Sequence, residues 1–106
     1  MKHYIVYYRR WPKQSPSSVE VAAQRAEAER LVSYNHGKIV ATYTDKEVKN
    51  TRRPEFPKAV AHAQRMEATL VICHLGRLAR NVTITRLLQN SGVDFVCLDN
   101  HDINRL

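Results

Sequence analysis

Arginine side chains gather in three short segments of this chain, and each segment directly follows a stretch of apolar residues. Arginine suits phosphate, because its planar guanidinium group donates paired hydrogen bonds and stays charged at neutral pH. Several such groups at one place could hold a phosphodiester and stabilise the charge that develops during phosphoryl transfer. The three segments contain Arg9 and Arg10, then Asp45, Lys46, Lys49, Arg52 and Arg53, and finally His74, Arg77 and Arg80.

The overall charge also favours a polyanionic partner. The 106 residues include 17 Lys and Arg against 10 Asp and Glu, which gives a formal net charge of +7. Such a balance favours nucleic acid, although a basic surface can also serve solubility alone. We expect no nucleotide cofactor, because the sequence contains neither glycine-rich phosphate motif. We expect no metal either, because the 5 histidines show no ligand spacing.

Length and composition predict one domain over residues 1–106. Two domains in this length would each be too small to bury a core without disulfides or metals. No apolar run is long enough to cross a membrane, and the first apolar run is too short for a signal peptide. Cys73 and Cys97 each lie inside an apolar run, so we expect reduced, buried thiols in a cytoplasmic protein.

Strand and helix patterns alternate along the chain. Runs of β-branched, aromatic and other apolar residues predict strands at 4–8, 39–43, 69–73 and 93–98. Helical patterns fill the intervals at about 17–35, 54–66 and 82–90, with a polar loop at 45–53. The order β-α-β-α-β-α-β predicts an α/β fold with three layers, in which a mostly parallel four-stranded sheet carries helices on both faces.

Local signals refine the three helices. Ser17 and Glu20 have the spacing of a capping box at the start of the first helix, and Gly37 suits its end. Pro54 suits the first turn of the second helix. The expected inward faces are Val19, Ala22, Ala23, Ala26 and Leu31 in the first helix, Phe56, Ala59, Val60, Ala63 and Met66 in the second, and Ile84, Leu87 and Leu88 in the third.

The predicted fold brings the arginine segments together. Ligands of open α/β sheets bind beyond the carboxyl ends of the strands, and all three segments follow strands. We therefore expect one anion site at this edge of the sheet.

Several short motifs share an order and spacing with a known family. They are Tyr7-Tyr8-Arg9, Ala23-Gln24-Arg25, Thr44-Asp45-Lys46, Arg53-Pro54-Glu55, Leu70-Val71-Ile72, the segment 75–81 and the segment 91–96. Together they resemble the N-terminal catalytic domain of the serine recombinases, the resolvase and invertase family. Leu75-Gly76-Arg77-Leu78-Ala79-Arg80-Asn81 is the most specific of them.

The resemblance implies DNA strand exchange. Members of this family cut DNA with a serine hydroxyl, which forms a phosphoserine link to a DNA 5′ end, and they exchange strands as a tetramer without metal or cofactor. Carried over by position, the catalytic arginines are Arg9, Arg77 and Arg80. The phosphate- or DNA-binding residues are Arg10, Gln24, Asp45 and Arg53.

Two positions depart from the family pattern. Trp11 stands where the family has its serine nucleophile, and Gly76 replaces the aspartate before the arginine pair. We therefore expect a domain that binds DNA through phosphate but is deficient in cleavage, with self-association or pairing with an active relative. Trp11 would either stack on a base or fill the vacated pocket.

Other interpretations stay open. A displaced serine such as Ser15 could act as the nucleophile, whereas Ser17 or Ser18 is more simply a helix cap. The chain could also be a non-catalytic remnant or a protein-interaction module. It ends before the long dimerisation helix of the family, so we expect no separate DNA-reading domain.

Overall fold

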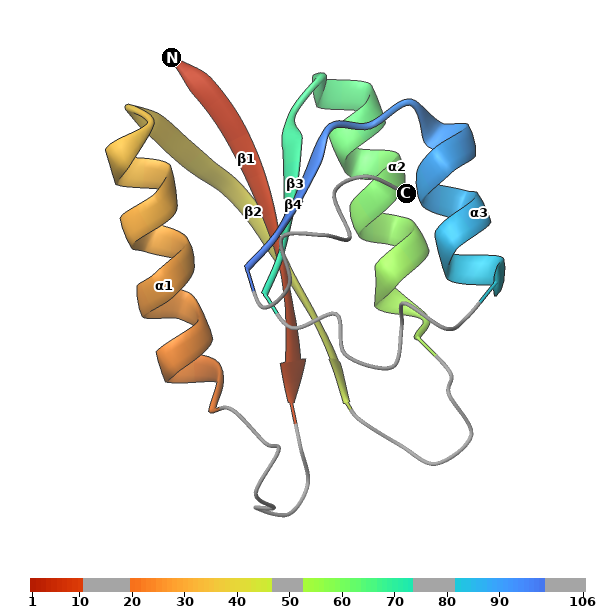
Figure 1. Ribbon diagram of the computed structural model, residues 1–106, viewed down its shortest axis with the longest axis horizontal. Helices are drawn as coiled ribbons and strands as arrows, with labels where there is room; N and C mark the ends of the chain where they lie inside the picture. The colour runs from red at the N-terminus through yellow and green to blue at the C-terminus, as the bar shows by residue number, and fades with distance from the viewer. Residues whose placement is uncertain (11–19, 47–52, 74–81, 99–106) are drawn as a thin grey trace.

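Strands and helices alternate along the chain in the expected order (Figure 1). The computed structural model describes residues 1–10, 20–46, 53–73 and 82–98. Their elements are β1 (Lys2–Arg10), α1 (Val21–Tyr34), β2 (Gly37–Lys46), α2 (Glu55–Met66), β3 (Thr69–Ile72), α3 (Val82–Ser91) and β4 (Phe95–Cys97).

The four strands form one parallel sheet in the order β2-β1-β3-β4. Consecutive parallel strands need a crossover connection, and a helix follows each of the first three strands. Helix α1 covers one face of the sheet, whereas α2 and α3 lie side by side on the other (Figure 1). The three-layer α/β class predicted from the sequence is confirmed.

The central strand β1 contributes to two hydrophobic cores. Ile5 and Tyr7 pack in the core under α2 and α3. Tyr4, Val6 and Tyr8 alternate with them and pack in the core under α1. Residues 4–9 are all buried, as expected for a strand that is covered on both faces.

The edge strand β2 contains a bulge that changes which face its side chains occupy. Tyr4 pairs with Ile39, but the next residue, Ile5, pairs with Ala41, so Val40 is an extra residue in β2. Ile39 therefore packs in the core under α1, whereas Ala41 and the alternate residues after it lie on the face covered by α2. The bulge thus determines the face on which the carboxyl end of β2 presents its side chains.

Helix α1 buries a different face from the one predicted. The buried residues are Gln24, Ala28 and Val32, and Leu31 is partly buried. The predicted Ala22, Ala23 and Ala26 are exposed, and Val19 lies outside the described residues. Leu31 packs against the core as predicted. The prediction was wrong for the three alanines because it followed apolar residues only, whereas the buried face contains a glutamine whose amide is hydrogen bonded.

The predicted start of α1 was wrong, whereas its predicted end near Asn35 is confirmed. The helix begins at Val21, with Glu20 rather than Ser17 at the N-cap, and Ser17 lies outside the described residues. At the other end, the side-chain Nδ2 of Asn35 donates a hydrogen bond to the backbone carbonyl of Leu31. The next residue, His36, adopts the left-handed conformation, with φ of 56°. Gly37 is not the helix terminator but the first residue of β2.

Two further predictions differ from the structure. Asp45 and Lys46 belong to β2 rather than to a loop, because they pair with Arg9 and Arg10 of the longer strand β1. Met66, predicted to face inward, is exposed at the end of α2. The other predicted inward residues of α2 and α3 are buried or packed against the core.

Position 37 needs glycine because a side chain there would clash with the Tyr4 ring, not because the backbone is left-handed. A Cβ atom at this position would lie 2.7 Å from Cδ2 of Tyr4, closer still to Cε2, and 3.0 Å from the carbonyl oxygen of Lys2. The Tyr4 ring is buried in the core under α1, so it has little room to move away.

We predict that Gly37→Ala lowers the free energy of unfolding by about 1–3 kcal/mol, the usual cost of overpacking. Urea denaturation measures this loss. Adding Tyr4→Leu removes the clashing ring atoms, so the double variant should lose less than the two single losses combined. A Gly37→Ala variant as stable as the wild type would contradict this explanation.

Candidate functional site

Gln24 joins α1 to the end of β1. Its side-chain oxygen accepts a hydrogen bond from the Arg9 backbone N–H at 3.0 Å, and its Nε2 donates to the Arg9 carbonyl at 2.6 Å. The side chain therefore binds both backbone groups of one residue, as a neighbouring strand would. The thiol of Cys73 in turn approaches the Gln24 carbonyl at 3.7 Å. This arrangement holds the backbone of Arg9 in place.

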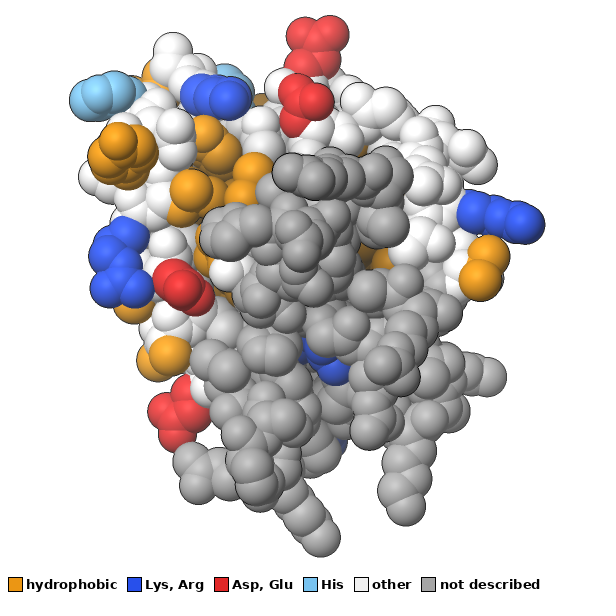
Figure 2. Space-filling view, viewed as in Figure 1, with side chains coloured by type: hydrophobic (Ala, Val, Ile, Leu, Met, Phe, Trp, Pro, Cys, Tyr) orange, Lys and Arg blue, Asp and Glu red, His pale blue; other side chains and the backbone are white. Residues whose placement is uncertain are grey.

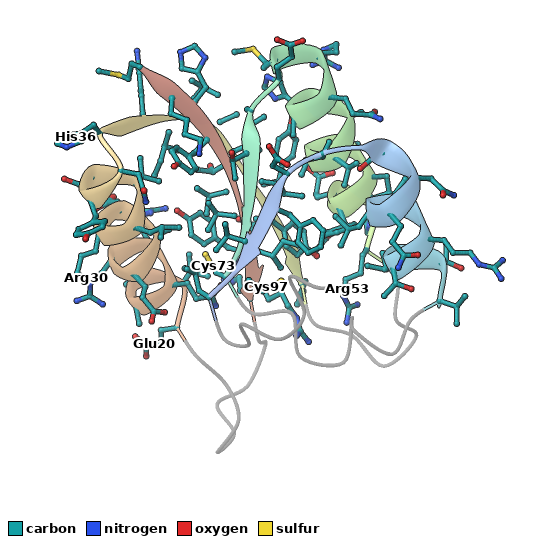
Figure 3. All side chains as sticks on the ribbon, turned by 45° about the horizontal axis from the view of Figure 1, so that its top comes forward. Glu20, Arg30, His36, Arg53, Cys73 and Cys97 are labelled. Carbon is teal, nitrogen blue, oxygen red and sulfur yellow. The ribbon has the colours of Figure 1, made fainter. Side chains whose placement is uncertain are left out.

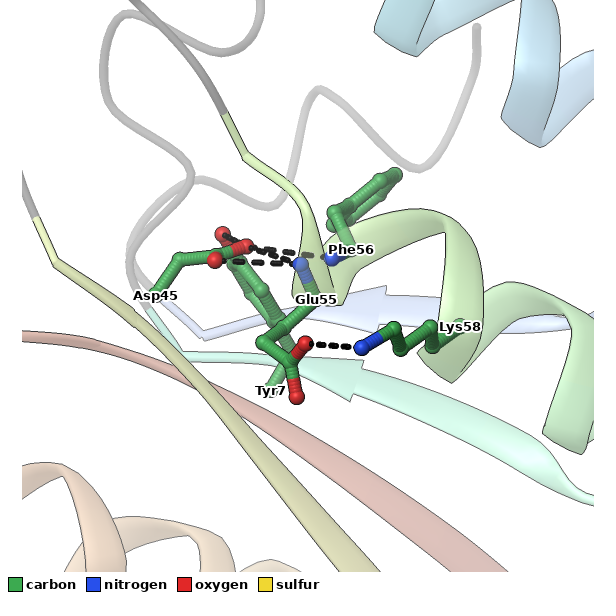
Figure 4. Close-up of polar contacts among 5 residues, drawn as sticks. All are labelled: Tyr7, Asp45, Glu55, Phe56 and Lys58. Atoms are coloured by element: carbon green, nitrogen blue, oxygen red, sulfur yellow. Dashed lines mark hydrogen bonds and ion pairs between the residues drawn. The ribbon is translucent and has the colours of Figure 1, made fainter.

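Asp45 caps the N-terminus of α2 from the end of β2 (Figure 4). Both of its carboxylate oxygens accept from the Glu55 N–H at 3.1 Å, and Oδ2 also accepts from the Phe56 N–H at 3.0 Å. The first N–H groups of a helix have no partner within the helix, and a carboxylate is favoured there. Pro54 precedes the helix without a side-chain capping bond, so Asp45 supplies the cap from another element.

Tyr7 completes this arrangement from β1. Its hydroxyl donates to Asp45 Oδ2 at 2.8 Å, and its ring meets Phe56 edge to face at 5.0 Å between centroids. Burial raises the pKa of the Tyr7 phenol well above its ordinary value, and the hydrogen bond to Asp45 raises it further. The phenol therefore stays protonated and remains a donor to the carboxylate.

Arg9 and Arg53 place two guanidinium groups in the same neighbourhood. Arg9 is 3% exposed and Arg53 is 7% exposed, and the Nε atoms of both are shielded from solvent. The positive charges of Arg53 and Arg9 act on the Tyr7 phenol and oppose the rise in its pKa. Figure 3 shows Arg53 at the start of α2, at the end of the sheet where the strands terminate. Two cations and one carboxylate thus surround one phenol.

The structure brings together four of the residues predicted from the sequence, namely Arg9, Gln24, Asp45 and Arg53. Arg10 lies at the same edge, where it pairs with Lys46 in register, and its side chain is exposed. The remaining predicted residues lie outside the described residues, and their roles stay predictions: Trp11, Ser15, Gly76, Arg77 and Arg80.

The sequence interpretation missed what Tyr7 and Phe56 do. Both were placed in their elements as apolar residues, but Tyr7 binds Asp45, and Phe56 supplies a capped N–H and a ring contact. The available signal was a helix start at Pro54 with no local capping residue, which implies a cap from elsewhere.

Beside this start, exposed Lys58 pairs with Glu55 at 2.8 Å, and that hydrogen bond raises the pKa of Lys58 (Figure 4).

Two features are absent from the described part of the chain. Among those residues, no group of three or more His, Cys, Asp and Glu side chains is placed to hold a metal ion. No helix in the same residues has the length and apolar character needed to span a membrane.

The family model for the resolvase N-terminal domain matches residues 5–105. Because the match covers nearly the whole chain, this protein belongs to the resolvase N-terminal domain family, as the sequence motifs indicated. No match was found among curated proteins.

The Tyr7 arrangement predicts a pH-dependent loss of stability. Tyr7→Phe keeps the ring but removes a hydrogen bond to a carboxylate, so we expect a loss of about 1.5–3 kcal/mol at neutral pH. Above about pH 10 the tyrosines of the unfolded chain ionise while folded Tyr7 keeps its proton. The wild type then loses stability as pH rises, and its advantage over Tyr7→Phe shrinks.

Urea denaturation at about pH 7 and about pH 10.5 measures both effects. Tyr34→Phe is the matched control, because Tyr34 is 85% exposed and should change stability by less than about 0.5 kcal/mol. An equal difference between wild type and Tyr7→Phe at both pH values would count against this account.

Proposed function

We propose that this chain is a serine-recombinase-type domain that binds the phosphate backbone of DNA at the carboxyl edge of its sheet. The observation that carries the proposal is a pair of buried arginines, Arg9 near the carboxyl end of β1 and Arg53 just before α2, in a chain of the resolvase N-terminal domain family. Guanidinium groups fixed by surrounding structure suit phosphate oxygens, because less rotamer freedom is lost on binding. Arg10, Arg77 and Arg80 extend the same phosphate-binding set in this proposal.

Gln24 and Asp45 act in this proposal as positioning residues. The amide of Gln24 is engaged by the backbone of Arg9, and the carboxylate of Asp45 is engaged by α2 and Tyr7. A carboxylate would repel a phosphate. The role of Asp45 in this proposal is therefore to hold the start of α2, two residues after Arg53.

We further propose that the domain binds DNA without cutting it. The support is chemical: the indole of Trp11 cannot attack phosphorus, and Gly76 cannot replace the carboxylate that the family pattern places before Arg77. The arginines would then retain phosphate binding after the loss of the nucleophile.

Binding is tested by titrating short duplex DNA against the fluorescence of Trp11, which is the only tryptophan. We expect a saturable change whose affinity falls steeply between about 50 and 200 mM salt, because phosphate contacts release counterions. Arg53→Ala should weaken binding about tenfold and reduce the salt slope by about 1.

Arg65→Ala is the matched control, since it removes the same charge from the last turn of α2, far along the helix from Arg53. Thermal unfolding of both variants shows whether each is folded. No saturable change at about 50 mM salt, or equal losses in folded Arg53→Ala and Arg65→Ala, would overturn the proposed site.

Cleavage is tested separately with nicked duplex DNA and a denaturing gel. We expect no covalent protein–DNA species at any protein concentration. A covalent species that Ser15→Ala abolishes would instead establish a displaced nucleophile and an active recombinase.

A further inference from the structure

The outer side of α1 carries a stripe of four side chains, Ala23, Glu27, Arg30 and Tyr34. Their spacing of four, three and four residues places them on one face of the helix. All four are exposed, and Tyr34 is 85% exposed. Figure 3 shows Arg30 pointing away from the sheet. This stripe, called the α1 stripe below, lies away from the buried face of the helix.

No other element of the described residues covers the α1 stripe. Among the described helices, only α1 lies on its side of the sheet (Figure 1). In Figure 2 its outer side, at the left of the view, carries hydrophobic, basic and acidic side chains next to one another. A large exposed tyrosine beside small and charged residues resembles a protein-binding surface, because tyrosine is enriched where interfaces gain most of their affinity.

The α1 stripe is complementary to itself. Ala23 and Tyr34 are equally distant from the midpoint between Ala28 and Glu29, and so are Glu27 and Arg30. Two antiparallel copies related by a two-fold axis at this midpoint would place each Tyr34 against the small Ala23 of the other copy. The same alignment would place each Glu27 opposite an Arg30. One alignment therefore satisfies both size and charge.

We propose that two copies of this chain associate through the α1 stripe as an antiparallel, two-fold symmetric helix pair. The interface is isologous, so each favourable contact occurs twice. The α1 stripe is turned away from Gln24, which faces the sheet and binds Arg9. The arginine edge consequently remains accessible in the dimer, and this proposal does not depend on DNA binding.

Sedimentation equilibrium of the full chain tests the dimer over about 1 μM to 1 mM protein. Because one helix pair is smaller than a standard interface, we expect a reversible dimer whose dissociation constant lies within this range. Glu27→Arg and Arg30→Glu each create two like-charged pairs, so each should weaken self-association about tenfold or more. A mixture of the two variants should associate again, because every pair then has opposite charges.

Glu29→Arg is the matched control for Glu27→Arg, since it makes the same charge change on the same helix away from the α1 stripe. It should leave the dissociation constant within about twofold. Tyr34→Ala should weaken the dimer without loss of helix content, which circular dichroism measures. A wild-type chain that stays monomeric up to about 1 mM, or a mixture that fails to associate, would overturn the proposal.

Discussion

The carboxylate of Asp45 is the contact on which the arrangement of the site depends. It binds the first two N–H groups of α2 and the hydroxyl of Tyr7, so it joins a strand, a helix and a second strand at one point. Without this carboxylate the Glu55 N–H would lose the acceptor that Asp45 provides, and an unsatisfied buried donor costs about 1–3 kcal/mol. The Phe56 N–H would keep only its bond to the Arg53 carbonyl, at 3.2 Å. Because Arg53 lies two residues before α2, the contact that fixes the helix start also fixes the position of this arginine.

A second contact, on the other face of the sheet, fixes the backbone position of the other arginine, Arg9. Gln24 reaches from α1 to both backbone groups of Arg9 and so holds the end of β1 on one face of the sheet. On the other face, the hydrogen bond from Tyr7 of β1 to Asp45 of β2 holds the same end of the strand. A neutral amide and a carboxylate thus fix the backbone of Arg9 and the helix start that follows Arg53. Rigid support of this kind is what a phosphate site needs, since flexible side chains lose affinity through ordering.

The sequence predicted the element order and the fold class, because both rest on strong local signals. The apolar spacing of α2 from Phe56 to Ala63 predicted its buried face correctly. The same reasoning failed for α1, where alanines are frequent on every side and the decisive buried residue is Gln24. Hydrophobic periodicity cannot identify a polar residue that is buried because its partner lies in another element.

The local preferences follow from the amino-acid sequence alone: strands at apolar runs, helices between them, and arginines at or beyond the strand ends. The face that each side chain occupies near the site depends on packing in three dimensions. Val40 is an extra residue in β2, and without the bulge Asp45 would fall on the face covered by α1 rather than on that of α2. The register of one strand against its neighbour depends on packing across the whole sheet, so no local signal around Asp45 could reveal it.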